Sequence, residues 1–229
     1  MTKTTHHSIL VTGFEPFGGE KINPAWEAVA QLPHTIASAS CTKLQIPVEF
    51  GVAFQQVEAA LTQIQPDIVV CVGQAGGRAC ITPEFVAINY VDARIPDNAG
   101  AQPHNKPLVA QGPAAYFATL PVQAMVAAMQ AANVPAAVSY TAGTYVCNEV
   151  MYCLLHLLAQ SYPHAQGTFI HVPYAIEQAS TLAANTPSMS VDTMVRGLTV
   201  ALKTAVHCKD ADYKGFSAQD KSLSSGTLC

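Results

Sequence analysis

The chain has 229 residues, half of them apolar, so it can bury one substantial core. Only 11% of the residues are charged and the formal net charge is −4, which excludes a basic surface for nucleic acid. No stretch approaches the roughly eighteen uninterrupted apolar residues of a membrane span, and segment 1–8 has no signal-peptide core. We therefore expect a cytoplasmic protein with small or neutral partners, and neither nucleic acid nor membrane among them.

The first half of the chain alternates predicted strands and helices. An apolar run over 8–14 predicts a buried strand that stops near Gly13. Asn23 as cap and Pro24 at the first helical position predict a helix over 24–32. The expected elements that follow are a strand over 43–48, a helix over 54–64 and a buried strand over 67–73 that runs into the glycine-rich segment 73–78.

The second half continues the alternation after an irregular segment, 81–105, in which a strand over 85–90 is expected. The further expected elements are a helix over 122–129, a strand over 136–140, a helix over 150–158, a strand over 168–172 and a last helix over 191–202 that ends near His207. This order predicts an α/β fold, a three-layer α/β/α sandwich with a largely parallel central sheet. We expect one catalytic domain over 1–208 and a polar, flexible tail over 209–229.

The cysteines limit the chemistry of the chain. There are seven, an odd number, with no C-x-x-C pair, so neither a disulfide framework nor a thiolate zinc site is expected. Histidines and carboxylates at the short spacing of a metal site are also not visible, which argues against a metal-dependent hydrolase. The glycine-rich segment 73–78 matches neither the dinucleotide fingerprint nor the P-loop. We therefore expect no metal and no cofactor.

Three chemically useful residues follow predicted core strands, where ligands bind in parallel sheets. Cys147 lies between a strand and a helix, and the helix N-terminus would favour its thiolate. His171 is the histidine placed on a core strand, and Glu84 is the acid best placed to orient its ring. Each also has an ordinary interpretation from pattern alone: a small buried thiol, a core histidine, and a capping or solvated acid.

Several motifs together resemble the pyroglutamyl peptidase I family of cysteine peptidases, over roughly residues 8–208. The matching text is Thr12-Gly-Phe-Glu-Pro-Phe-Gly-Gly19 with Asn23-Pro24, Gly73-Gln-Ala-Gly-Gly-Arg78 with Ile81-Thr-Pro-Glu84, Asp92-Ala-Arg-Ile-Pro-Asp-Asn98, Thr141-Ala-Gly-Thr-Tyr-Val-Cys-Asn148 and His171-Val-Pro173. Motifs of this length in family order make the resemblance specific. It implies an omega peptidase that hydrolyses the bond after an N-terminal pyroglutamyl residue of peptides through a thioester, and commonly a homo-oligomer, a dimer or tetramer.

The resemblance also implies roles for individual residues. Cys147 resembles the family nucleophile, His171 the general base and acid, and Glu84 the acid that orients the histidine. The residues that resemble the family's substrate-binding groups are Phe14 and Phe17, which hold the pyrrolidone ring, Gln74, whose loop hydrogen-bonds the lactam, and Arg94, near the active site. An aromatic slot with one or two polar groups suits a small flat lactam.

Two positions depart from the family pattern. The family usually has Arg or Lys after the catalytic Glu, where this chain has Phe85, and Asn before the Thr-Ala-Gly run, where this chain has Tyr140. We expect loss of the cation to alter how Glu84 is held, and Tyr140 to reshape the pocket floor. The alternative function is therefore a catalytically impaired small-molecule binding protein on the same scaffold, with the segment 73–78 binding an anion.

Overall fold

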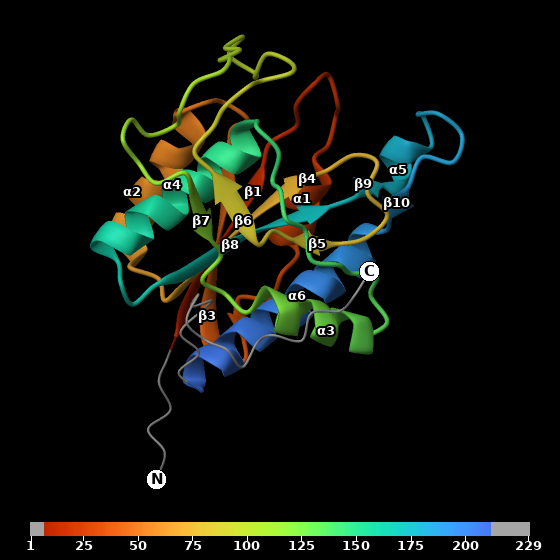
Figure 1. The fold of residues 1–229 in the computed structure, drawn as a ribbon. Coiled ribbons are helices and arrows are strands. Elements are labelled where there is room, and N and C mark those ends of the chain that lie inside the picture. Colours follow the sequence, from red (N-terminus) through yellow and green to blue (C-terminus); the bar gives the residue numbers. More distant parts are fainter. Residues whose placement is uncertain (1–6, 212–229) are drawn as a thin grey trace, which may run out of the picture.

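The computed structural model describes residues 7–211 and centres on a six-stranded sheet (Figure 1). Its strand order is β2-β3-β1-β4-β8-β5. The four parallel strands are β1 (Ser8–Phe14), β3 (Ala39–Ile46), β4 (Ile68–Gln74) and β8 (Gln166–Val172). Two short strands, β2 (Thr35–Ile36) and β5 (Thr82–Pro83), pair antiparallel at the two edges. The largely parallel sheet expected from the sequence is confirmed.

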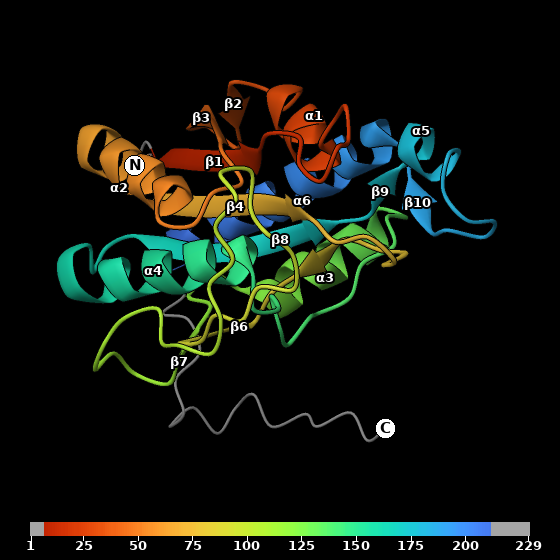
Figure 2. The ribbon, with the colours of Figure 1, turned by 90° about the horizontal axis from the view of Figure 1, so that it is seen from above.

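Helices cover both faces of this sheet (Figures 1 and 2). One face carries α1 (Pro24–Ala30), α3 (Val122–Ala131) and α6 (Val191–Asp210), and the other carries α2 (Val52–Ile64) and α4 (Val146–Ser161). Successive strand residues alternate between the two cores, so that Ile9 packs under the first layer and Leu10 under the second. The three-layer α/β/α sandwich follows from this alternation.

The start of α1 forms as the sequence predicts. Asn23 accepts a hydrogen bond from the Ala25 N–H at 3.1 Å, and Pro24 occupies the first helical position. A Cβ at Gly13 would lie 2.9 Å from the Trp26 Cα, so only glycine lets β1 end this close to the helix. The end of β1 and the start of α1 are therefore held together beside the loop that contains Phe17.

The expected strand over 136–140 is wrong, although the segment does run beside β5. It makes isolated parallel bridges, Ile81 with Ala136 and Glu84 with Ser139. Two backbone hydrogen bonds join the segment to β5. The Ala137 N–H donates to the Ile81 carbonyl, and the Ser139 N–H donates to the Pro83 carbonyl. Proline has no N–H, so the bond that would join these two halves of the ladder cannot be made.

Several element bounds also differ from the expectation. β3 begins at Ala39 rather than at 43, and α6 continues to Asp210, past the expected end near His207. The expected strand over 85–90 is the shorter β6 (Val86–Ile88), which pairs antiparallel with β7 (Ala115–Phe117). A small pair, β9 (Tyr174–Ala175) and β10 (Ser188–Met189), flanks the short helix α5 (Ile176–Ala179).

Most of the tail expected over 209–229 lies outside the described residues, which end at 211. Within residues 7–211, no helix combines the length and the apolar character that crossing a membrane requires.

Candidate active site

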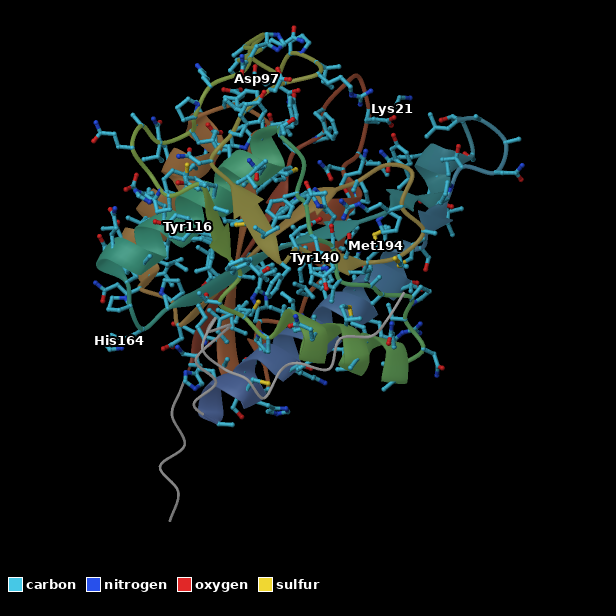
Figure 3. All side chains as sticks on the ribbon, in the orientation of Figure 1. Lys21, Asp97, Tyr116, Tyr140, His164 and Met194 are labelled. Carbon is cyan, nitrogen blue, oxygen red and sulfur yellow. The ribbon has the colours of Figure 1, made fainter. Side chains whose placement is uncertain are left out.

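The three candidate catalytic side chains come together at the carboxyl ends of the central strands. His171 is near the end of β8, Glu84 follows β5, and Cys147 is the second residue of α4. The loops that contain Lys21 and Asp97, both labelled in Figure 3, extend beyond the same end of the sheet. These two loops supply Phe17, Glu20, Asp92 and Arg94 to one cavity that Cys147 and His171 also line.

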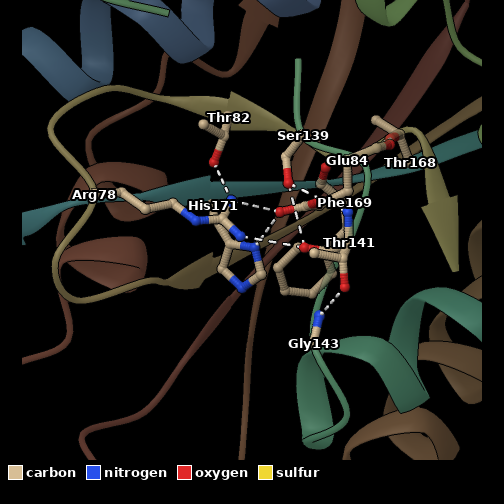
Figure 4. Close-up of polar contacts among 9 residues, drawn as sticks. All are labelled: Arg78, Thr82, Glu84, Ser139, Thr141, Gly143, Thr168, Phe169 and His171. Carbon is tan, nitrogen blue, oxygen red and sulfur yellow. Dashed lines mark hydrogen bonds and ion pairs between the residues drawn. The ribbon is translucent and has the colours of Figure 1, made fainter. Parts of the chain in front are cut away.

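Glu84 and His171 form a buried pair (Figure 4). The His171 Nδ1 lies 2.7 Å from the Glu84 Oε1, with exposed fractions of 4% and 0% for the two residues. Because an ionised carboxylate only accepts hydrogen bonds, Nδ1 carries the proton and Nε2 is left as the basic nitrogen. The Glu84 backbone is tied to β8 by hydrogen bonds with Phe169 and Thr168, at 2.8 and 2.9 Å. The acid is thus fixed to the strand that carries the histidine.

Arg78 is a functional candidate that the sequence reasoning missed. Its Nη1 lies 2.6 Å from the same Glu84 oxygen, and its Nη2 donates to the Thr141 carbonyl at 3.2 Å (Figure 4). Burial alone would raise the pKa of Glu84, but the hydrogen bond and charge of His171, together with Arg78, lower it. The sequence could have indicated this role, because Arg78 is only six residues before Glu84 in a chain with few charges.

Cys147 packs tightly against β4. A Cβ at Gly73 would lie 2.7 Å from the Phe169 ring and 3.1 Å from the Cys147 Sγ, so a larger residue here would displace the ring and crowd the thiol. Burial raises the pKa of the Cys147 thiol to about 12, and the Glu84 charge adds to this effect. Arg78 and the backbone N–H at the helix start act in the opposite direction but are outweighed. Burial thus favours the thiol form of Cys147, against the effect of the helix N-terminus.

The cavity has a volume of about 530 Å³ and adjoins a smaller pocket of about 50 Å³. The two share Phe17, Gln74, Tyr145 and Cys147 as lining residues. Phe14, whose ring lies 6.2 Å from that of Phe169, lines the small pocket only. The exposed Arg94 lines the large cavity only. All four expected substrate-binding residues thus line one or both of two neighbouring pockets that Cys147 also lines.

Phe85 and Tyr140 do not affect this space in the way expected from the sequence. The Phe85 ring lies 5.8 Å from that of Tyr140 and 5.2 Å from that of Phe117, and Tyr140 is 65% exposed. Neither residue lines either cavity, so the expected reshaping of the pocket floor by Tyr140 has no direct contact behind it. A cation still reaches Glu84, because Arg78 supplies it. The changes at 85 and 140 therefore give no reason to favour an impaired binding protein.

The pKa shift of His171 predicts where activity is lost at acid pH. Burial lowers the pKa of His171 below its ordinary value, and this outweighs the opposite effect of Glu84. The imidazole can accept the thiol proton only above that pKa, so activity should persist as the pH falls to about 6.5 and be lost below it. We expect the acid limb of kcat/KM below pH 6.5. A limb at or above pH 7 would contradict the burial argument.

A thiol and a basic imidazole nitrogen that line one cavity, with a buried carboxylate paired to the imidazole, are the arrangement of a cysteine-dependent hydrolase. Within the described residues, no group of three or more His, Cys, Asp or Glu is placed to hold a metal ion.

Comparison with known proteins gives the family. The chain belongs to the pyroglutamyl peptidase family, whose model matches residues 7–208. It is 52% identical to pyrrolidone-carboxylate peptidase 2 of Photorhabdus laumondii over 204 residues. These residues are 89% of this chain and 93% of that relative. It is 51% identical to a pyrrolidone-carboxylate peptidase of Enterococcus faecalis, over 88% of this chain and 94% of that one.

Solved structures agree with this assignment. Pyroglutamyl peptidase I of Bacillus amyloliquefaciens is 45% identical with a TM-score of 0.84, over 89% of this chain and 98% of that one. A mutant pyrrolidone carboxyl peptidase of Pyrococcus furiosus is 40% identical with a TM-score of 0.83. The match covers 87% of this chain and 98% of that one.

Proposed function

We propose that this chain is a cysteine exopeptidase that removes an N-terminal pyroglutamyl residue from peptides, with Cys147, His171 and Glu84 as its catalytic residues. The observation that carries the proposal is that His171, which lines the same cavity as Cys147, is paired with the buried carboxylate of Glu84. The small pocket beside the thiol, lined by Phe14 and Phe17, gives a flat ring a place next to the nucleophile.

The reaction starts from the protonated thiol. His171 takes the Cys147 proton as the sulfur attacks the pyroglutamyl carbonyl, and Glu84 stabilises the imidazolium that forms. The backbone N–H groups at the start of α4, with Arg94 nearby, stabilise the oxyanion. His171 then gives its proton to the leaving amine, a thioester remains on Cys147, and a water activated by His171 hydrolyses that thioester.

The lining of the substrate pocket favours the lactam ring of a pyroglutamyl residue. Phe14 and Phe17 offer apolar faces, and Gln74 supplies one polar group between the two cavities. A neutral ring needs no charged partner, whereas a glutamyl residue would bring a charged amine and a carboxylate into a pocket without counter-charges. The site therefore favours an uncharged ring with an acceptor.

A comparison of three anilides tests this function. Pyroglutamyl anilide should be cleaved, while prolyl and glutamyl anilides should not be. Proline leaves the lactam partners of the site unsatisfied, which costs on the order of 1–3 kcal/mol per group. Equal rates on prolyl and pyroglutamyl anilide would show that the lactam is not what the site reads, and no cleavage of any anilide by a folded protein would overturn the proposed activity.

We further propose that the enzyme is cytoplasmic, that residues 1–208 form one catalytic domain, and that it assembles as a homo-oligomer, a dimer or tetramer. The chain is half apolar with few charges, which leaves apolar surface for association. Light scattering at micromolar concentration should give a mass above that of one chain. A monomer under those conditions would contradict the assembly.

A further inference from the structure

Gln178 is a buried polar side chain to which the proposed reaction assigns no role. It lies on α5, is only 4% exposed, and reaches Gln74 at the end of β4. Its Nε2 lies 3.0 Å from the Gln74 Oε1, and its own Oε1 accepts the Ala175 N–H at 3.0 Å. A buried amide with partners at both ends is held in one orientation.

A backbone group fixes the orientation of both amides. The Ala175 N–H can only donate, so the Gln178 atom that faces it must be the carbonyl oxygen. The Gln178 NH₂ group then faces Gln74 and can also only donate, so Gln74 must present its oxygen in return. The Ile22 carbonyl, 3.5 Å from the same Gln178 nitrogen, is a second acceptor that agrees with this orientation.

The NH₂ group of Gln74 is therefore left for a ligand. Gln74 lines both the large cavity and the small pocket beside Cys147. Its Nε2 has no hydrogen-bond partner among residues 7–211, and it is not one of the fully buried polar atoms without a partner. This nitrogen is thus an unpaired donor that is not fully buried, on a residue that lines both pockets.

We propose that Gln178 is a positioning residue that turns the Gln74 NH₂ group toward the pocket, where it donates to the ring carbonyl of the pyroglutamyl residue. The inference rests on the proposed function. In the opposite orientation, the Gln74 oxygen would face the ring carbonyl and repel it. Proline, which has no ring carbonyl, would leave this donor unpaired.

Gln178→Glu tests the proposal with a change of one group. The carboxylate cannot donate to the Gln74 oxygen, so Gln74 should turn its NH₂ group toward residue 178 and its oxygen toward the ligand. We expect the KM for pyroglutamyl anilide and the Kd for 2-pyrrolidone, measured by calorimetry, to rise about tenfold or more. The kcat should stay near the wild-type value, because this contact is the same in ground and transition states.

Two further variants separate orientation from packing. Gln178→Met removes the hydrogen bonds without imposing the wrong orientation, so its KM and Kd should rise less than in Gln178→Glu. Gln31→Glu adds the same charge on the exposed end of α1 and should change neither constant. A purely structural role for Gln178 would instead lower kcat and the melting temperature together in both substitutions of residue 178, and that pattern would overturn the proposal.

The remaining outcomes are also decisive. Unchanged KM and Kd in the variants of Gln178, in an enzyme that cleaves pyroglutamyl anilide, would overturn the inference and leave the proposed function intact. If the wild type cleaves no anilide, the proposed function fails, but the affinity for 2-pyrrolidone still tests the orientation of Gln74. A wild type that does not bind 2-pyrrolidone would overturn the inference as well. Should Gln178→Glu not fold, unchanged constants in Gln178→Met alone would overturn it.

Discussion

Replacing Cys147 by serine should lower kcat for pyroglutamyl anilide by about 10³-fold or more, without unfolding the protein. A serine hydroxyl is far less acidic than a thiol, and His171, whose pKa burial has lowered, is a weak base for removing its proton. The oxygen is also smaller than sulfur, so it fits the space beside Gly73 without strain. Steady-state kinetics with circular dichroism as the check on folding measure this directly.

The same helix supplies a matched control. Cys153 lies six residues further along α4, is also partly buried, and has a thiol pKa that burial raises to about 12. Cys153→Ser should keep the wild-type rate, because this thiol lines neither cavity. If Cys147→Ser were as active as Cys153→Ser, the nucleophile would have to be another group.

Glu84→Gln should lower kcat/KM by about 10²-fold, less than the loss of the nucleophile. The amide can still accept the His171 hydrogen bond, but it no longer stabilises the imidazolium that forms during attack. It also leaves Arg78 without its counter-ion, 2.6 Å from the former carboxylate oxygen. The pKa of His171 should fall further, because the carboxylate that raises it is gone.

The pH profile of this variant separates a chemical role from a packing role. The acid limb of its pH profile should lie at lower pH than that of the wild type. A simple loss of packing would instead lower the rate at every pH without moving the limb. Glu58→Gln, an exposed change on α2, removes the same charge far from the site and should have no effect. Near-normal kinetics in Glu84→Gln would show that this acid does not act on His171.

Strands β1, β4 and β8 were predictable because they are buried on both faces. β3, which has exposed residues along its length, was predicted only from 43. The run over 67–73 is almost entirely buried in β4, and Asn23 with Pro24 marks the helix start that the structure has. The segment 136–140 shows where local pattern fails. Its apolar residues suit a strand, but the missing donor belongs to Pro83, more than fifty residues away, and becomes relevant only once β5 lies beside the segment.

The candidate site was predictable in part for a related reason. Parallel strands bring their carboxyl ends to one edge, which places His171 of β8 at the site. Glu84 and Cys147 were grouped with it correctly, although β5 runs antiparallel to β8 and segment 136–140, before Cys147, is not a strand. Contacts between loops could not be placed in this way. Arg78 reaches Glu84 through the turn before β5, and Gln178 reaches Gln74 from a helix of four residues that has no sequence pattern of its own. The high pKa of Cys147 also depends on burial by β4 and Phe169, which the helix N-terminus alone does not reveal.

Trapping the acyl-enzyme tests directly whether Cys147 is the nucleophile. The enzyme is mixed with excess pyroglutamyl ester, quenched in acid during turnover, digested, and the peptides are read by mass spectrometry. We expect one pyroglutamyl group on the peptide that contains Cys147, lost on treatment with hydroxylamine and absent in Cys147→Ser. Turnover without any label on Cys147, or a label on a different residue, would contradict a mechanism in which this thiol is the nucleophile.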